Sequence, residues 1–184
     1  LLARDVLGRV VGVDPSALTF ARTCDRCGQQ HGPPRLVGHP KVQVSLARTA
    51  GLVAVAVSTV GPVGVDVELV AATDFAGFDA VATHPADRSG AVDRLGRARG
   101  WVRKEAALKA LGVGLRADPA TVRELVPGQA RAVLPGHPSV VVTDLDLTAV
   151  LASAGHVAAL GLVVNRGRPL QSAAANLEVV VHPA

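Results

Sequence analysis

The chain has 184 residues, of which 49% are hydrophobic but only 2% aromatic, and its formal net charge at pH 7 is +4. This length can bury a sizeable core in one domain or in two small packed halves. No apolar run approaches the roughly 18 residues of a membrane helix, and the start is too charged for a secretory signal. We therefore expect a cytoplasmic protein that does not span a membrane. The positive charge favours an anionic partner without distinguishing nucleic acid, phosphorylated cofactor and acidic protein.

Apolar and polar residues alternate with periods that predict mixed helical and strand structure. The segment Cys24–Pro34 is rich in turn-forming residues and is predicted to be a loop. The chain begins at Leu1 without a methionine, so we expect the first half, residues 1–61, to be truncated at its start. Its other predicted elements are a helix over residues 1–12, a turn at Asp14–Ser16, and strands over Ala17–Ala21, Val42–Leu46 and Leu52–Val60.

The second half, residues 62–184, is predicted to begin after the Gly61-Pro62 turn. Its segment Thr73–Gly100 is predicted to form one or two short helices and a mobile connection. From residue 165 onward the weakly patterned tail is predicted to be poorly ordered. A helix is expected over Trp101–Leu115, and strands over Val63–Leu69, Thr121–Val126, Ala130–Leu134, Ser139–Val142 and His156–Val164.

The predicted helix Trp101–Leu115 combines strong helix formers with a defined end, because two glycines follow its periodic part. Its periodicity places Glu105 and Lys109 one turn apart on the same face. Two interpretations are open from this segment alone. The pair is either an exposed salt bridge that adds a few tenths of a kcal/mol, or part of a functional site.

The predicted strand Val63–Leu69 directs its valines to one face and the carboxylates of Asp66 and Glu68 to the other. Two such side chains stand about 7 Å apart and can converge on one cation. Their hard oxygen atoms suit Mg²⁺, whereas the alternative is an ordinary strand with a solvated acidic face. No basic residue stands between them, so we expect a bound cation to balance their repulsion.

The spacing Cys24-x2-Cys27-x3-His31 is that of half a zinc site. Structural zinc requires four ligands, and His39 is the one nearby candidate for the fourth. A loop with free thiols is therefore the favoured interpretation, and a basic zinc-knuckle protein that binds nucleic acid is a remote alternative. We do not expect nucleic-acid binding, because no aromatic residues accompany the basic ones as a stacking platform.

GVDVE, Gly64–Glu68, followed by WVRKEAALKA, Trp101–Ala110, resembles the two signature motifs of the 4′-phosphopantetheinyl transferase superfamily. The closer resemblance is to the larger, pseudo-dimeric type that activates surfactin-like peptide synthetases and polyketide synthases. Cys24–Pro34 and Val42–Thr49 are similar to that family's loop ending in Gly-Lys-Pro and to its strand ending in Ser-His-Ser/Thr. The resemblance implies an α/β (α+β) fold of two similar halves in a monomer with pseudo-two-fold symmetry.

The same resemblance implies transfer of the phosphopantetheine arm from coenzyme A to a serine of an acyl or peptidyl carrier protein. The other product is 3′,5′-ADP, and the setting is secondary metabolism or fatty-acid biosynthesis. Asp66, Glu68 and Glu105 correspond to the family's Mg²⁺ ligands. Glu105 and Lys109 take the catalytic positions, and the coenzyme-binding positions fall on Lys104, Lys109, Arg48 and Thr49.

Two departures from the family pattern affect the coenzyme site. Ala47 and Arg48 stand where the family has Ser-His, and Arg48 is either a phosphate contact or a solvated loop arginine. Pro33 replaces the lysine of Gly-Lys-Pro, and Arg35 is the nearest substitute cation. A relative that binds coenzyme A or a carrier protein but catalyses poorly is therefore the alternative function.

Overall fold

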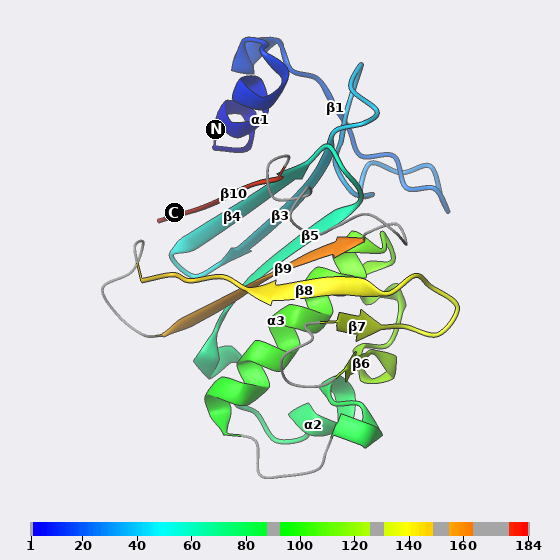
Figure 1. Ribbon diagram of the computed structural model, residues 1–184, viewed down its shortest axis with the longest axis vertical. Coiled ribbons are helices and arrows are strands. Elements are labelled where there is room, and N and C mark those ends of the chain that lie inside the picture. Colours follow the sequence, from blue (N-terminus) through cyan, green and yellow to red (C-terminus); the bar gives the residue numbers. More distant parts are fainter. Residues whose placement is uncertain (1, 88–92, 126–130, 149–154, 164–176, 184) are drawn as a thin grey trace.

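The computed structural model describes residues 2–87, 93–125, 131–148, 155–163 and 177–183, and it has a mixed α and β fold with two antiparallel sheets (Figure 1). The first sheet has the strand order β1-β2-β3-β4-β10 and contains β1 (Phe20–Ala21), β2 (Arg35–Leu36), β3 (Gln43–Thr49), β4 (Leu52–Ser58) and β10 (Leu177–Pro183). The second has the order β5-β9-β8-β7-β6 and contains β5 (Val63–Leu69), β6 (Arg123–Leu125), β7 (Arg131–Val133), β8 (Val140–Asp144) and β9 (His156–Val163).

Helices connect and cover these sheets. Within the described residues, no helix has both the length and the apolar character needed to cross a bilayer. The α-helices are α1 (Leu2–Val11), α2 (Phe78–Ala82) and α3 (Arg94–Ala110), and the 3-10 helices are η1 (Pro15–Ala17), η2 (Val70–Thr73), η3 (Pro85–Asp87), η4 (Gly114–Arg116) and η5 (Pro119–Thr121).

The described elements stack in four layers: α1, the first sheet, the second sheet and α3 (Figure 1). Val6 and Leu7 of α1 pack on one face of the first sheet. Alanines on the other face of that sheet meet the valines of β5. β4 lies between α1 and the second sheet, so its sequence is a continuous apolar run. β5 is also covered on both faces, but its sequence alternates, because the face towards α3 carries Gly64, Asp66 and Glu68. The finer expectation, two similar pseudo-dimeric halves, remains a prediction.

Two glycines allow α3 to pack directly on the backbone of the second sheet. Gly64 of β5 and Gly161 of β9 are opposite each other in the ladder. A Cβ atom at Gly64 would lie 2.0 Å from the carbonyl oxygen of Ala106, and one at Gly161 would lie 2.8 Å from it. The absence of these two side chains therefore brings the helix close enough for its own side chains to reach β5.

Helix α3 begins earlier than predicted. It starts at Arg94 rather than Trp101, because the Asp93 carboxylate accepts a hydrogen bond from Gly96 N at 2.7 Å and caps the first turn. Glycines at positions 96 and 100 concealed this first part of the helix, since glycine disfavours helix interiors. The helix also ends earlier than the predicted bound at Leu115: it stops at Ala110, and Gly112, the first of the two glycines expected to end it, follows with φ of 70°.

The predicted poor order of the tail is wrong for Leu177–Pro183. These residues form β10 and pair with the whole of β4, from Leu177 opposite Ser58 to Pro183 opposite Leu52. The segment lacked a local signal for order, because its partner strand lies more than a hundred positions earlier in the chain. Residues 165–176 of the predicted tail lie outside the described part.

Most other predicted strands are present with shifted ends. The predicted strand at Ala17–Ala21 is reduced to β1, since η1 occupies its first residue. The short β2 was not predicted, because two residues carry no periodicity. The polar segment before α3 contains α2 and η3, in agreement with the predicted short helices.

Candidate functional site

Four charged side chains meet between β5 and α3. Asp66 and Glu68 project from the face of β5 opposite its buried valines, and Glu105 and Lys109 lie one turn apart on α3. Asp66 and Glu105 are only 8% and 7% exposed, whereas Glu68 and Lys109 are half-buried. The structure therefore brings together the catalytic and metal-binding residues that the sequence predicted. We call these four residues the charged cluster.

Lys109 compensates Asp66 directly. Its Nζ atom lies 2.7 Å from Asp66 Oδ1 and also donates to the carbonyl oxygen of Val65 at 3.2 Å. The expectation that only a bound cation balances the strand carboxylates is thus wrong for Asp66. The balancing charge comes from another element, which the sequence around the strand does not contain.

Glu68 accepts a hydrogen bond from a residue of the first sheet. The Thr49 hydroxyl, at the end of β3, donates to Glu68 Oε1 at 2.6 Å, and the same oxygen accepts from Leu69 N at 2.8 Å. A second link between the two sheets is buried, where Ser45 Oγ accepts from Val65 N at 3.0 Å. Sequence reasoning gave Ser45 no role, although strand alternation already places it on the same face as Thr49.

Glu105 is the uncompensated member of the cluster. Its Oε1 atom is buried and has no hydrogen-bond partner. Burial raises the pKa of Glu105 to about 7, and the negative charges of Asp66 and Glu68 act in the same direction, while Lys109 opposes them. Burial also raises the pKa of Asp66, with Lys109 again opposing. A carboxylate of this kind is suited to accept a proton near neutral pH or to bind a cation.

The ligand types of the charged cluster suit Mg²⁺, but its three carboxylates do not lie close enough together in the structure to form a metal-ligand group. Three carboxylates offer the hard oxygen ligands that this ion prefers, and Glu105 Oε1 is a buried oxygen without a partner. The carboxylates do not all converge in the structure, because Asp66 faces Lys109 and Glu68 faces Thr49. Binding one ion by all three would require these side chains to move closer together.

Two of the predicted coenzyme contacts lie elsewhere. Lys104 is 3% exposed, donates from Nζ to the Ala82 carbonyl oxygen at 2.8 Å and lies 3.9 Å from Asp87 Oδ2. Arg48 is exposed on the face of β3 opposite Thr49, because neighbouring strand residues point to opposite faces. Of the predicted coenzyme residues, only Lys109 and Thr49 reach the charged cluster.

A separate group of side chains lies in the connection between β1 and β2. Potential ligand atoms of Cys24, Cys27 and His31 all lie within 4.8 Å of one another, and Cys27 Sγ is 3.0 Å from His31 Nε2. Both cysteines are free thiols, Cys24 buried and Cys27 exposed. His39, the fourth ligand considered from the sequence, instead lines a neighbouring cavity.

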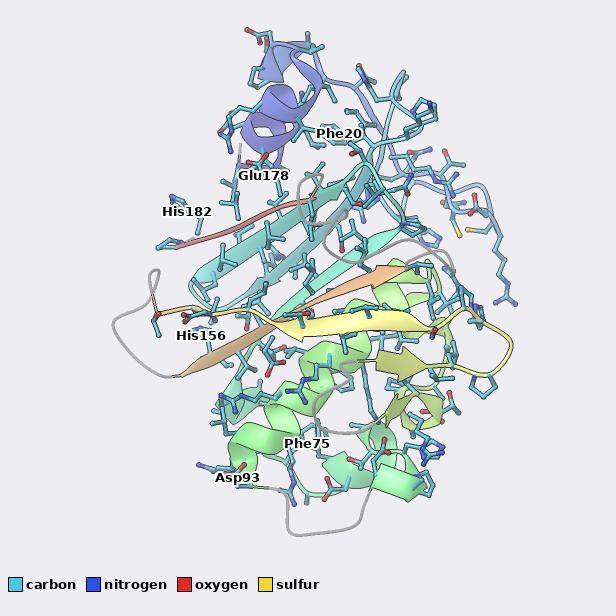
Figure 2. All side chains as sticks on the ribbon, in the orientation of Figure 1. Phe20, Phe75, Asp93, His156, Glu178 and His182 are labelled. Atoms are coloured by element: carbon cyan, nitrogen blue, oxygen red, sulfur yellow. The ribbon has the colours of Figure 1, made fainter. Side chains whose placement is uncertain are left out.

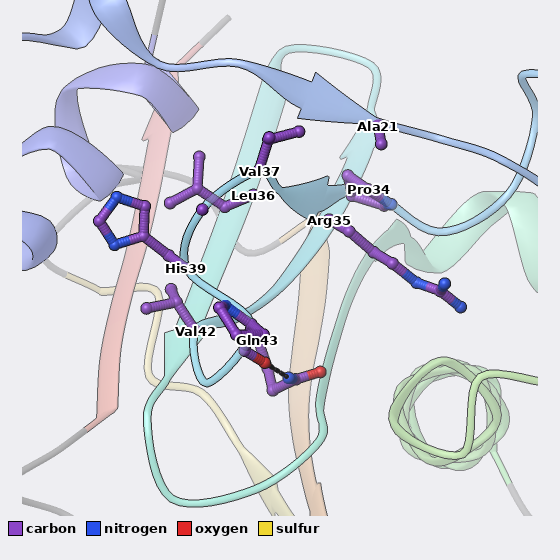
Figure 3. A pocket seen from close by; sticks show the side chains of 10 residues that line it. Ala21, Pro34, Arg35, Leu36, Val37, His39, Val42 and Gln43 are labelled. Carbon is purple, nitrogen blue, oxygen red and sulfur yellow. Dashed lines mark hydrogen bonds between the residues drawn. The ribbon is translucent and has the colours of Figure 1, made fainter.

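That cavity has a volume of about 330 Å³, is partly open to solvent and is lined by residues of β1, β2 and the segment leading into β3 (Figure 3). Arg35 and His39 are its ionisable lining residues, and their side chains extend in different directions (Figure 3). Arg35 Nη2 pairs with Asp25 Oδ2 at 2.7 Å, and both side chains are exposed. None of the lining residues belongs to the charged cluster, so the cavity is a distinct feature of the first sheet.

No protein-family model matches the chain, and none of the curated proteins compared with it shows significant sequence similarity. Its function therefore has to be inferred from the arrangement of its own side chains and from the resemblance of its two motifs.

Proposed function

We propose that this protein is a Mg²⁺-dependent 4′-phosphopantetheinyl transferase that modifies a serine of an acyl or peptidyl carrier protein. One observation carries the proposal: Glu105 has a buried oxygen without a partner and a pKa near 7, beside the ion pair of Asp66 and Lys109. These residues belong to the two motifs that resemble the signature of this superfamily. A buried acidic cluster with shifted pKa values is typical of functional sites.

The reaction requires a base and a cationic environment. The carrier serine hydroxyl attacks the phosphorus atom attached to pantetheine, its proton passes to Glu105, and the bond from that phosphorus to 3′,5′-ADP breaks. A base with a pKa close to the ambient pH accepts this proton efficiently. When bound by Asp66, Glu68 and Glu105, Mg²⁺ would supply charge that neutralises the diphosphate.

Lys109 is suited to hold the diphosphate. A lysine ammonium has three donors, and Asp66 Oδ1 and the Val65 carbonyl oxygen take two of them. The side chain is 28% exposed, so the third donor is available for a phosphate oxygen. Asp66 thereby fixes the position of the ammonium group that would stabilise the departing 3′,5′-ADP.

The carrier protein is proposed to bind near the segment before α3. Phe75, Val81 and Leu95 are three of the exposed large apolar side chains of the described residues, and Phe75 lies at the same end of α3 as Asp93 (Figure 2). Exposed apolar side chains of this size often mark binding surfaces. Carrier proteins are typically acidic, and the positive net charge of the chain favours such a partner.

A second candidate is a protein that binds coenzyme A or a carrier protein without efficient catalysis. Its support is the placement of Lys104 and Arg48, which are directed away from the charged cluster. Calorimetry distinguishes the candidates, because this alternative predicts coenzyme binding without Mg²⁺-dependent turnover.

The test is incubation of the full-length protein with coenzyme A, Mg²⁺ and a panel of apo carrier proteins, followed by mass spectrometry of each carrier. We expect one carrier to gain the phosphopantetheine arm, and Glu105→Gln to slow the gain by about 100-fold or more. Glu178→Gln, which removes an exposed carboxylate paired with Arg9, is the matched control and should retain full activity. Coenzyme binding without modification of any carrier would favour the second candidate. If the protein neither modified a carrier nor bound coenzyme A, both candidates would be rejected.

A further inference from the structure

We propose that Cys24, Cys27 and His31 form a zinc-binding site that is separate from the charged cluster. The three side chains come from one connection of the first sheet, and no step of the proposed transfer uses them. The inference rests on the side-chain geometry, on the turn that carries the thiols and on the ligand types.

The geometry is close to that of a zinc site. Tetrahedral zinc, with bonds of about 2.3 Å to sulfur and about 2.0 Å to nitrogen, places such ligand atoms roughly 3.5–3.8 Å apart. All three potential ligand atoms lie within 4.8 Å of one another, and the separation of Cys27 Sγ from His31 Nε2 is 3.0 Å. The separations therefore differ from those of a zinc site by about 1 Å or less.

The turn between the cysteines is shaped to present both thiols. Gly28 N donates to the Cys24 carbonyl oxygen at 2.9 Å, and Gly28 adopts φ of 71°, which a residue with a side chain rarely does. The Cys24 N–H donates in turn to the Gln29 carbonyl oxygen at 2.8 Å, so backbone hydrogen bonds hold the turn that carries both thiols.

Contacts on the other side of the loop fix His31. Gly32 N donates to the Arg22 carbonyl oxygen at 2.6 Å, and Arg22 Nε donates to the Gly32 carbonyl oxygen at 3.1 Å. A Cβ atom at Gly32 would lie only 2.6 Å from the Thr23 carbonyl oxygen, so the strands of the loop approach closely there. This approach holds the imidazole beside the thiols rather than leaving it on an extended loop.

The ligand types select zinc rather than the Mg²⁺ proposed for the charged cluster. Two thiolates and one imidazole are soft or borderline ligands, which favour zinc over magnesium. Three protein ligands leave one tetrahedral position, and because Cys27 and His31 are exposed, water can reach it.

The test uses the full-length protein under reducing conditions, with zinc content measured by elemental analysis and affinity by competition with a chromogenic chelator. We expect one zinc ion per chain. Cys24→Ser, Cys27→Ser and His31→Gln should each weaken zinc binding by about 100-fold or more, since even loss of a residue that only supports a ligand costs about 10–100-fold. His39→Gln and His137→Gln are matched histidine controls and should bind zinc as the unmodified chain does.

Cobalt gives a second measurement that does not depend on the cysteine variants folding. Co²⁺ added to the unmodified chain should produce the thiolate charge-transfer and tetrahedral ligand-field absorption, and His31→Gln should alter it. The proposal is overturned if the unmodified protein does not compete with the chelator for zinc, or if both cysteine variants bind zinc as tightly as the unmodified protein does. A Cys24–Cys27 disulfide that persists under reducing conditions would overturn it too. Each result is independent of transferase activity, which depends on Mg²⁺ and the charged cluster.

Discussion

Lys109 on α3 donates to Asp66 on β5 at 2.7 Å, rather than to Glu105, which lies one turn earlier on the same helix. The cation of the cluster is therefore engaged by one carboxylate, while the buried Oε1 atom of Glu105 has no partner. Burial raises the pKa of both carboxyl groups, but Lys109 opposes the shift of Asp66 through a direct ionic contact, whereas the pKa of Glu105 reaches about 7 without one. Because Lys109 neutralises the charge of Asp66 but not that of Glu105, Glu105 is the carboxylate suited to accept a proton or bind a cation.

Glu105 should make the stability of the metal-free protein fall as pH rises. Its pKa is about 7 in the folded protein against an ordinary value of 4.5, so the folded state binds more protons between these values. The free energy of unfolding should therefore decrease from about pH 4.5 to about pH 7, by on the order of 2–3 kcal/mol for this group. Chemical denaturation across this pH range, without Mg²⁺, measures it.

Glu105→Gln is the matched variant, because it removes the ionisable group while retaining shape. It should be more stable than the unmodified chain at pH 8 and should show a smaller decrease with pH. Addition of Mg²⁺ at pH 8 should stabilise the unmodified chain more than the variant. Identical pH profiles for the two proteins would contradict the raised pKa.

Lys109→Met should destabilise the protein and remove transferase activity. The substitution leaves the Asp66 carboxylate buried without its ionic partner, at a cost of about 1–3 kcal/mol, reduced from the value for a fully buried pair because Lys109 is partly exposed. The double variant Lys109→Met/Asp66→Asn should recover most of the stability but none of the activity. Thermal unfolding and the carrier assay separate the two effects, and a double variant less stable than the single one would refute the pairing.

Lys104→Met should affect stability rather than coenzyme binding. Lys104 is buried and donates to the Ala82 carbonyl oxygen, so its loss should cost about 1–3 kcal/mol by leaving that acceptor unpaired. The KM for coenzyme A should remain unchanged, in contrast to a residue that contacts phosphate. Steady-state kinetics together with denaturation provide the measurement. An increased KM with unchanged stability would restore the phosphate role that the motif resemblance implies.

Gly64→Ala should separate β5 from α3. The added Cβ atom would lie 2.0 Å from the Ala106 carbonyl oxygen, and backbone atoms cannot move aside as a side chain can. We expect a loss of about 3 kcal/mol or more in the free energy of unfolding, together with loss of activity. Gly155→Ala is the control, since the nearest atom to its Cβ would be Leu69 Cδ2 at 3.9 Å. Equal stability of the two variants would contradict the close packing of α3 on the sheet.

The sequence alone determined the features that depend on local periodicity. Strand alternation over Val63–Leu69 placed Asp66 and Glu68 on one face, as the structure has them. Helical periodicity placed Glu105 and Lys109 on one side of α3, and the glycine at position 112 marked its end. These features follow from neighbouring residues, because backbone geometry fixes where side chains a few positions apart must point.

Only the tertiary structure decided which groups contact one another across elements. The partner of Lys109 is 43 positions away, and the burial of Lys104 against the Ala82 carbonyl oxygen depends on how α2 packs beside α3. The pairing of β10 with β4 was also decided by the tertiary structure, because the sequence of a strand does not specify which strand it pairs with. Glu105 thus became the uncompensated carboxylate only when the packing of α3 on β5 assigned Lys109 to Asp66.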